Sequence, residues 1–221
     1  MSIAARIDHT LLKPTASAEE IDVLCREAEE YGFAAVCVPP PFVQRAARLL
    51  NHSRVKIATV IGFPFGYSTA KAKLAETLQA IDDGAHELDA VINLIALKNN
   101  DWDCLEAEIA MLTPAIHQQG RIIKVIIESG VLTDEEIIRC CKIYAKAGVD
   151  FLKTSTGYAA KGASVEHVQL LRRHLPSAIK IKASGGIRDL DFASKLLAAG
   201  ADRLGCSAGV AIVKQQMENN E

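Results

Sequence analysis

Hydrophobic residues are distributed along this chain in two alternating patterns. Short apolar runs, too brief for a helix, predict buried strands, as at 34–38, 55–61 and 87–93. Between these runs, apolar residues spaced three or four apart predict helices with one buried face. The clearest helix lies between Ser17 and Gly32, because Ser17 and Glu20 form a capping-box pattern and glycine is typical of a helix end. The pattern therefore indicates strands alternating with helices.

The number of repeats selects among the folds that share this alternation. Strands are predicted to start near residues 7, 34, 55, 87, 121, 149, 178 and 202. Eight strand-helix units predict a TIM (β/α)8 barrel, with residues 1–221 as a single domain. An open doubly wound sheet is the alternative, since it has the same alternation. We favour the barrel because the count reaches eight and no G-x-G-x-x-G follows the first strand.

Composition and charge narrow the possible functions. With 25 Lys plus Arg, 27 Asp plus Glu and no block of like charge, the chain lacks the basic footprint of a nucleic-acid binder. No apolar run has the length of a membrane span, and the N-terminus does not resemble a secretory signal. The six cysteines show no C-x-x-C spacing, which indicates reduced thiols in the cytoplasm. Neither they nor the scattered histidines predict a metal site.

In a barrel, functional residues lie at the C-terminal ends of the strands. Lys153 is predicted at the end of the sixth strand, among apolar neighbours. Burial favours the neutral amine, which can attack a carbonyl and form a Schiff base. The alternative is a lysine whose ammonium group extends to a nearby carboxylate. The residues alone leave both interpretations open.

A second lysine, Lys182, is predicted at the end of the adjacent seventh strand. A neighbouring positive charge would lower the pKa of Lys153 and supply neutral amine near pH 7. Lys180 shares the strand face of Lys182, and Lys124 also lies in a strand, so side-chain parity cannot choose the partner. Of Lys180 and Lys182, we favour Lys182 because it lies closer to the loops that follow the strands.

Asp89, on the fourth strand, is the main acidic candidate. A carboxylate beside two lysines would stay ionised and could move protons through a water molecule. It could equally be a structural ion-pair partner for an interior lysine. Asp8, in the first strand, is a weaker candidate for the same cluster.

Glycine-rich segments follow the last two predicted strands, where TIM barrels commonly bind phosphate through backbone N–H groups and a helix N-terminus. Tight turns are the alternative reason for the glycines. Gly157, after the sixth strand, could add a donor, and Lys161 could add charge. We expect Cys37 and Cys206 to pack as small apolar side chains. The predicted phosphate-binding residues are Gly157, Gly185, Gly186, Gly205 and Ser207.

Nearly the whole chain resembles the deoxyribose-phosphate aldolase family, which belongs to the class I aldolases. The resemblance rests, in order, on IDHTLLKP, HELDAVIN, IIKVIIESG, FLKTSTG, IKASGGIRD and DRLGCSAG. It implies that Lys153 forms the Schiff base, that Lys182 tunes it and that Asp89 acts with a water as acid and base. The implied reaction is reversible cleavage of 2-deoxy-D-ribose 5-phosphate to D-glyceraldehyde 3-phosphate and acetaldehyde, in deoxyribonucleoside catabolism. It needs no metal or organic cofactor.

The resemblance also implies a homodimer or homotetramer, and it has local departures. Tyr158 stands where some relatives have a basic residue, and Ala208 stands where some have a second serine. The chain ends MENNE and lacks the C-terminal tyrosine of some relatives. Two alternatives remain: another lysine-dependent sugar-phosphate aldolase, or a catalytically silent barrel that binds a sugar phosphate.

Overall fold

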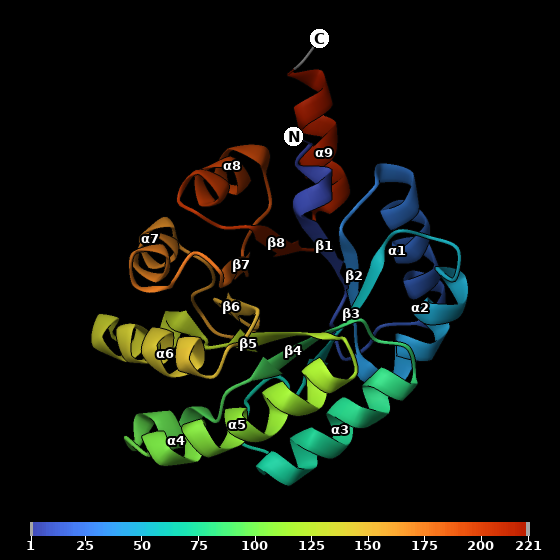
Figure 1. The fold of residues 1–221 in the computed structure, drawn as a ribbon. Helices are drawn as coiled ribbons and strands as arrows, with labels where there is room; N and C mark the ends of the chain where they lie inside the picture. Colours follow the sequence, from blue (N-terminus) through green and yellow to red (C-terminus); the bar gives the residue numbers. More distant parts are fainter. Residues whose placement is uncertain (1, 220–221) are drawn as a thin grey trace.

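The computed structural model describes residues 2–219. Their parallel strands close into a barrel in which each strand pairs with the next and β8 pairs with β1. Figure 1 shows these strands at the centre of a ring of helices. The predicted TIM barrel is therefore confirmed, and the open doubly wound sheet is excluded. The strands are β1 (Ile7–Thr10), β2 (Ala35–Val38), β3 (Lys56–Ile61), β4 (Glu87–Val91), β5 (Ile122–Ile126), β6 (Phe151–Lys153), β7 (Lys180–Ser184) and β8 (Arg203–Cys206).

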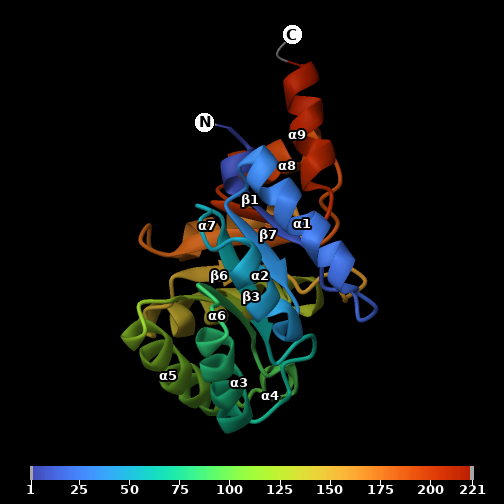
Figure 2. The ribbon, with the colours of Figure 1, turned by 90° about the vertical axis from the view of Figure 1, so that its right-hand side faces the viewer.

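Helices cover the outside of the barrel, and the ends of the described chain lie near each other beside the last helix (Figures 1 and 2). The α-helices are α1 (Ala18–Tyr31), α2 (Val43–Leu49), α3 (Ala70–Asp82), α4 (Leu94–Lys98), α5 (Trp102–Gln118), α6 (Asp134–Lys146), α7 (Val165–His174), α8 (Leu190–Ala198) and α9 (Gly209–Glu218). Short 3-10 helices occupy Ala4–Arg6, Pro40–Phe42 and Ser129–Val131.

Local sequence signals account for several of these boundaries. The predicted capping box at Ser17 and Glu20 is present, and Gly32 ends α1 in a left-handed conformation. A second capping box joins Thr133 and Glu136 at the start of α6. The fourth strand is shorter than the predicted 87–93, because the Asn93 side chain accepts a hydrogen bond from the Ala96 backbone and caps α4 instead.

Alternation along the strands separates an apolar layer from a charged one. Outward-facing strand residues pack with the helices in the main hydrophobic core. Inside the barrel, Cys37, Ala58 and Val60 form a separate, small apolar cluster. Charged side chains from six strands also lie in the described interior: Asp8, Glu87, Asp89, Lys124, Lys153, Lys182 and Arg203. Buried charges are costly unless they are paired, so this interior calls for a functional explanation.

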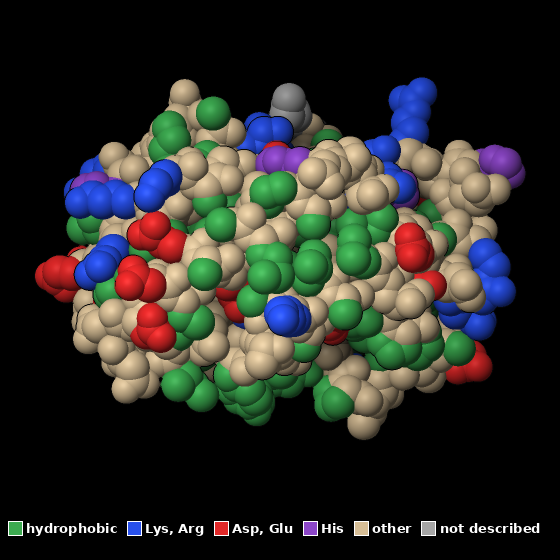
Figure 3. All heavy atoms as spheres, turned by 60° about the horizontal axis from the view of Figure 1, so that its bottom comes forward, with side chains coloured by type: hydrophobic (Ala, Val, Ile, Leu, Met, Phe, Trp, Pro, Cys, Tyr) green, Lys and Arg blue, Asp and Glu red, His purple; other side chains and the backbone are tan. Residues whose placement is uncertain are grey.

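The outer surface shows no comparable concentration of one charge in the view of Figure 3. Lysine and arginine side chains are interspersed with acidic ones there, and hydrophobic side chains gather near the centre of the face. Within residues 2–219, no helix is long and apolar enough to cross a membrane.

Candidate active site

Lys153 and Lys182 lie directly opposite each other on the paired strands β6 and β7. Both amines reach the same oxygen of Asp89 on β4: Oδ2 is 2.8 Å from Lys153 Nζ and 2.7 Å from Lys182 Nζ. All three side chains are buried. The structure thus brings together the three residues that the sequence analysis singled out as catalytic candidates.

Further charges complete the cluster around these three residues. Lys124 Nζ lies 2.6 Å from Asp89 Oδ1 and 2.7 Å from Glu87 Oε2. Asp8 Oδ2 is 2.5 Å from Lys182 Nζ, and Asp8 also accepts hydrogen bonds from Arg203. Lys124 and Lys182 each contact at least two carboxylates, whereas Asp89 is the only carboxylate within ion-pair distance of Lys153 in the described chain.

This unequal pairing separates the pKa values of the lysines. Burial lowers the pKa of Lys153, and the positive charge of Lys182 lowers it further, against the opposing attraction of Asp89. Burial acts in the same direction on Lys182, but Asp8 and Asp89 outweigh it and raise the pKa of Lys182. Lys124 also has a raised pKa, because Asp89 and Glu87 outweigh its burial. Of the three lysines, Lys153 is the one whose neutral form is favoured.

Asp8 and Asp89 of the cluster have lowered pKa values and remain ionised. Burial alone would raise the pKa of Asp89, but Lys124, Lys153 and Lys182 together hold it well below the usual range. The pKa of Asp8 is also lowered, since Lys182, Arg203 and Lys124 outweigh the effect of burial. Lys182 therefore stays positively charged beside Lys153, with ionised carboxylates compensating it.

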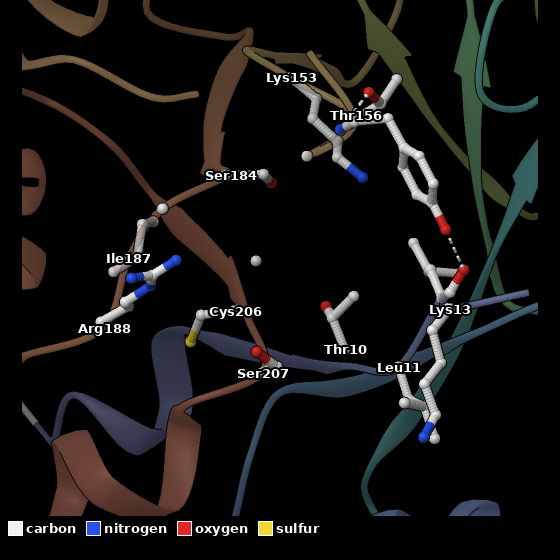
Figure 4. Close-up of a pocket in the computed structure, with 16 residues that line it drawn as sticks. Thr10, Leu11, Lys13, Lys153, Thr156, Ser184, Ile187, Arg188, Cys206 and Ser207 are labelled. Atoms are coloured by element: carbon white, nitrogen blue, oxygen red, sulfur yellow. Dashed lines mark hydrogen bonds between the residues drawn. The ribbon is translucent and has the colours of Figure 1, made fainter. Parts of the chain in front are cut away.

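A cavity of about 480 Å³ opens beside this cluster, formed by the loops that follow β1, β6, β7 and β8. Lys153 is the member of the charged cluster that lines it; Asp89 and Lys182 contact Lys153 but are absent from the lining among residues 2–219. Figure 4 shows the Lys153 amine pointing into the cavity, with Arg188 across from it. An amine with a lowered pKa thus faces a space large enough for a small sugar phosphate.

The predicted phosphate-binding residues all line the same cavity: Gly157, Gly185, Gly186, Gly205 and Ser207. The structure shows two reasons why glycine is needed at this wall, a left-handed backbone conformation and a close approach of neighbouring atoms. Gly185 has φ 92° and Gly186 has φ 79°, a left-handed conformation that disfavours other residues. A Cβ on Gly205 would lie 2.5 Å from Ser184 Oγ and 3.0 Å from Lys182 Cε, so glycine keeps space open at the cavity wall.

Some expectations about charged residues are revised by the structure. Lys161 is not among the described residues that line the cavity, whereas Arg188 and Lys13 are. Arg188 lies two residues after Gly186, and this proximity in GGIRD was the signal that could have identified it. Lys180 lies at the start of β7 and is exposed, with Nζ 5.6 Å from the centre of the Phe151 ring, so it is not the partner of Lys153.

Both cysteines considered earlier are buried. Burial raises the pKa of the Cys37 thiol, and it raises the pKa of Cys206 to about 12. Cys37 belongs to the small apolar group inside the barrel, and Cys206 lines the cavity while packing in the main core. Neither thiol is activated as a nucleophile.

Comparisons with known proteins find relatives that match nearly the whole chain. Residues 2–217 match the model of the DeoC/LacD family aldolases. The chain is 50% identical to deoxyribose-phosphate aldolase 1 of Bacillus licheniformis, covering 96% of this chain and 95% of that one. It is 47% identical to the deoxyribose-phosphate aldolase of Caldanaerobacter subterraneus, over 97% of this chain and 94% of that one.

A solved structure extends the similarity to three dimensions. The tetrameric deoxyribose phosphate aldolase from Aeropyrum pernix superposes with a TM-score of 0.92 at 33% identity, covering 98% of this chain and 92% of that one. The family match and the structural match both extend over nearly the whole chain. This chain belongs to the DeoC/LacD family of aldolases.

Proposed function

We propose that this aldolase reversibly cleaves 2-deoxy-D-ribose 5-phosphate to D-glyceraldehyde 3-phosphate and acetaldehyde through a Schiff base on Lys153. The observation that carries the proposal is the position of Lys153: its amine lines the cavity, has a lowered pKa and contacts Asp89 beside a positively charged Lys182. The names of the relatives support the choice of substrate.

The reaction begins with neutral Lys153, whose Nζ attacks C1 of the open-chain aldehyde. Loss of water gives a protonated imine. The imine accepts the electron pair of the C2–C3 bond as this bond breaks, and an enamine forms on Lys153. The C3 hydroxyl loses its proton to a water held by Asp89, and C3 becomes the aldehyde of D-glyceraldehyde 3-phosphate.

The second half of the reaction restores the lysine. The enamine is protonated at C2 after D-glyceraldehyde 3-phosphate leaves, and hydrolysis of the resulting imine releases acetaldehyde and neutral Lys153. Lys182 keeps its charge throughout, because its pKa is raised by Asp8 and Asp89. That charge disfavours protonation of the neighbouring amine, so Lys182 tunes Lys153 without reacting itself.

We assign phosphate binding to the cavity wall formed by the segments at the ends of β7 and β8. There the backbone N–H groups of Gly185, Gly186 and Gly205 are the proposed donors, and Ser207 precedes the N-terminus of α9. Arg188 supplies a positive charge on this side of the cavity (Figure 4). Gly157 completes the proposed set from the loop after β6.

Borohydride trapping tests the mechanism directly. The protein is incubated with 2-deoxyribose 5-phosphate, reduced, digested and analysed by mass spectrometry. An adduct on Lys153 is expected, with D-glyceraldehyde 3-phosphate and acetaldehyde as products in the unreduced reaction. An adduct on Lys182 would reverse the two lysine roles. Different products would identify another sugar-phosphate aldolase, and binding without an adduct would indicate a silent barrel.

We further propose a homodimer or homotetramer located in the cytoplasm. The tetrameric Aeropyrum pernix relative supports an oligomer, and the six unbridged cysteines are compatible with a reducing compartment. Size-exclusion chromatography with light scattering would measure the mass in solution, and a monomer at micromolar concentration would contradict the oligomer.

A further inference from the structure

Glu128 is a buried carboxylate next to the site that the reaction above does not use. It follows β5 and is only 3% exposed. Its backbone has φ 54° and ψ 55°, and Asn100 is the one other non-glycine residue in the described chain with positive φ. A glutamate held in this strained conformation needs compensating contacts from the surrounding structure.

Those contacts come from the loop between β6 and α7, which begins directly after Lys153. The Thr156 backbone N–H lies 3.2 Å from Glu128 Oε2 and 3.3 Å from Oε1, and the Thr156 hydroxyl also donates to Oε2. Asp89 has lysine partners, whereas Glu128 is held by one residue of a cavity-lining loop. Burial raises the pKa of Glu128, against the hydrogen bonds from Thr156.

The Thr156 hydroxyl links Glu128 to Tyr158 in the cavity wall. Since the Thr156 hydroxyl proton points to Glu128, its lone pairs are free to accept the Tyr158 backbone N–H, which lies 3.0 Å away. Tyr158 in turn connects two loops of the cavity wall: its hydroxyl donates to the Leu12 carbonyl at 2.9 Å. Its ring meets Phe63 edge-on, with the ring centres 5.4 Å apart. Both Thr156 and Tyr158 line the cavity, and Thr156 is labelled in Figure 4.

The segment around Glu128 supports the same loop at two further points. The Ser129 backbone N–H donates to the Thr154 carbonyl at 2.7 Å. Gly130 lies so close to the Lys161 backbone that a Cβ would collide with it. The residues after β5 therefore contact the β6–α7 loop at several points, and Glu128 is the residue that contacts Thr156.

We propose that Glu128 is a positioning residue: its carboxylate orients the Thr156 hydroxyl and thereby holds Gly157 and Tyr158 as the cavity wall beside Lys153. This rests on the proposed function, in which that wall contacts the sugar phosphate. Glu128 does not touch the reacting atoms. It acts through the loop, so its loss is expected to weaken substrate binding more than the chemical step.

Two substitutions at Glu128 separate hydrogen bonding from charge. Glu128→Gln keeps an oxygen that can accept from Thr156, while Glu128→Ala removes the acceptor and retains the same backbone strain. We expect Glu128→Ala to raise KM for 2-deoxyribose 5-phosphate on the order of 10-fold with a smaller change in kcat, and Glu128→Gln to stay within about 3-fold of wild type. Asn100→Ala is the matched control, since it changes the other strained residue away from the cavity.

Thr156→Val tests the same contact from the other side. It should also raise KM, and the double variant should lose less than the sum of the two single variants, because both substitutions remove the hydrogen bond between the Thr156 hydroxyl and the Glu128 carboxylate. This variant also keeps the test decisive if Glu128→Ala does not fold, which thermal unfolding would show. Unchanged KM in Thr156→Val and Glu128→Ala, or a Glu128→Gln variant as impaired as Glu128→Ala, would overturn the proposal.

Borohydride trapping separates this proposal from the proposed function. At saturating substrate, Glu128→Ala should still form the adduct on Lys153, since only positioning is lost. If wild-type protein forms no adduct, the proposed function fails, and calorimetric binding of 2-deoxyribose 5-phosphate then tests Glu128 alone: a Kd in Glu128→Ala equal to that of wild type would refute the positioning role.

Discussion

Two buried lysine ion pairs in this protein differ in what surrounds them. In the helix layer, Lys73 of α3 lies 2.7 Å from Glu108 of α5 and donates a second hydrogen bond to the Val91 carbonyl at 2.7 Å. Inside the barrel, Lys153 pairs with Asp89 at 2.8 Å. Burial lowers the pKa of both lysines. A lowered pKa therefore does not by itself identify a reactive amine.

The difference lies in access and in neighbouring charge. Lys73 is fully buried and is not among the described residues that line the active-site cavity, whereas Lys153 lines it. Lys153 also lies opposite a second buried lysine on the adjacent strand. A structural lysine and a reactive lysine can thus both be buried and ion-paired. The reactive lysine differs in having one side that faces a cavity.

The strongest test of this comparison is Lys153→Leu. Removal of the nucleophile should lower kcat/KM by more than about 1,000-fold and abolish the borohydride adduct, because the remaining residues cannot form the imine. Steady-state kinetics with 2-deoxyribose 5-phosphate measures the loss. Activity within 10-fold of wild type would show that another residue carries the covalent step.

Lys73→Met should produce the opposite result, a loss of stability with little loss of activity. It leaves the Glu108 carboxylate buried without its cation, which typically costs about 3–5 kcal/mol of unfolding free energy. Urea unfolding measures this cost, and kcat/KM of the folded protein should remain within about 3-fold of wild type. A large fall in kcat/KM would mean that the helix-layer pair shapes the site.

Lys182→Leu tests the neighbouring charge. Without the positive charge of Lys182, the pKa of Lys153 should rise, because one charge that disfavours protonation is gone and Asp89 is left with fewer lysine partners. The acid limb of the kcat/KM profile should then move to higher pH, with a loss of roughly 10-fold or more near pH 7. Lys180→Leu is the matched control on the same strand, and it should leave the profile in place.

If Lys180→Leu shifts the acid limb while Lys182→Leu does not, the role assigned to Lys182 is wrong. Trapping at high pH gives a second check, since Lys182→Leu should still form the adduct on Lys153 once the amine is neutral.

The smallest expected effect is on the pH dependence of stability. Asp8 and Asp89 have lowered pKa values, so their contribution is present above their unfolded pKa near 4 and is lost as pH falls through the lower folded values. Burial raises the pKa of Glu108, so its ionised carboxylate makes the folded protein less stable at neutral pH. This destabilisation is relieved as Glu108 takes up a proton while pH falls toward 4. Glu108→Gln should therefore lose stability more steeply than wild type between about pH 6 and 4, by a few °C in Tm. Parallel slopes would contradict this assignment.

Much of the local structure could be predicted from the residues. Ser17 with Glu20 marked the start of α1, since a capping box uses contacts within one turn. The strand starts were predicted within a few residues, because buried parallel strands are continuous apolar runs. Asn93 was assigned to a strand because its capping role depends on the chain that follows.

The site was predicted less completely than the fold. Lys153, Lys182 and Asp89 were found because charged residues within apolar strands are conspicuous. Arg188 and the β1–α1 loop were missed, since a loop residue shows no periodicity that reveals what it faces. Glu128 was missed for a related reason: it becomes noticeable only through its conformation and its contact with Thr156.

The sequence by itself determined the succession of strands and helices, the eight-unit count and the presence of charged residues on inward-facing strand positions. These are local properties, governed by periodicity, capping and strand parity. Only the tertiary structure decided that Lys182 rather than Lys180 lies beside Lys153, that Lys153 is the lysine facing the cavity, and that Asp8 and Asp89 keep Lys182 charged. Electrostatic interactions depend on distance and burial, and both are set when closure of the barrel brings distant strands together.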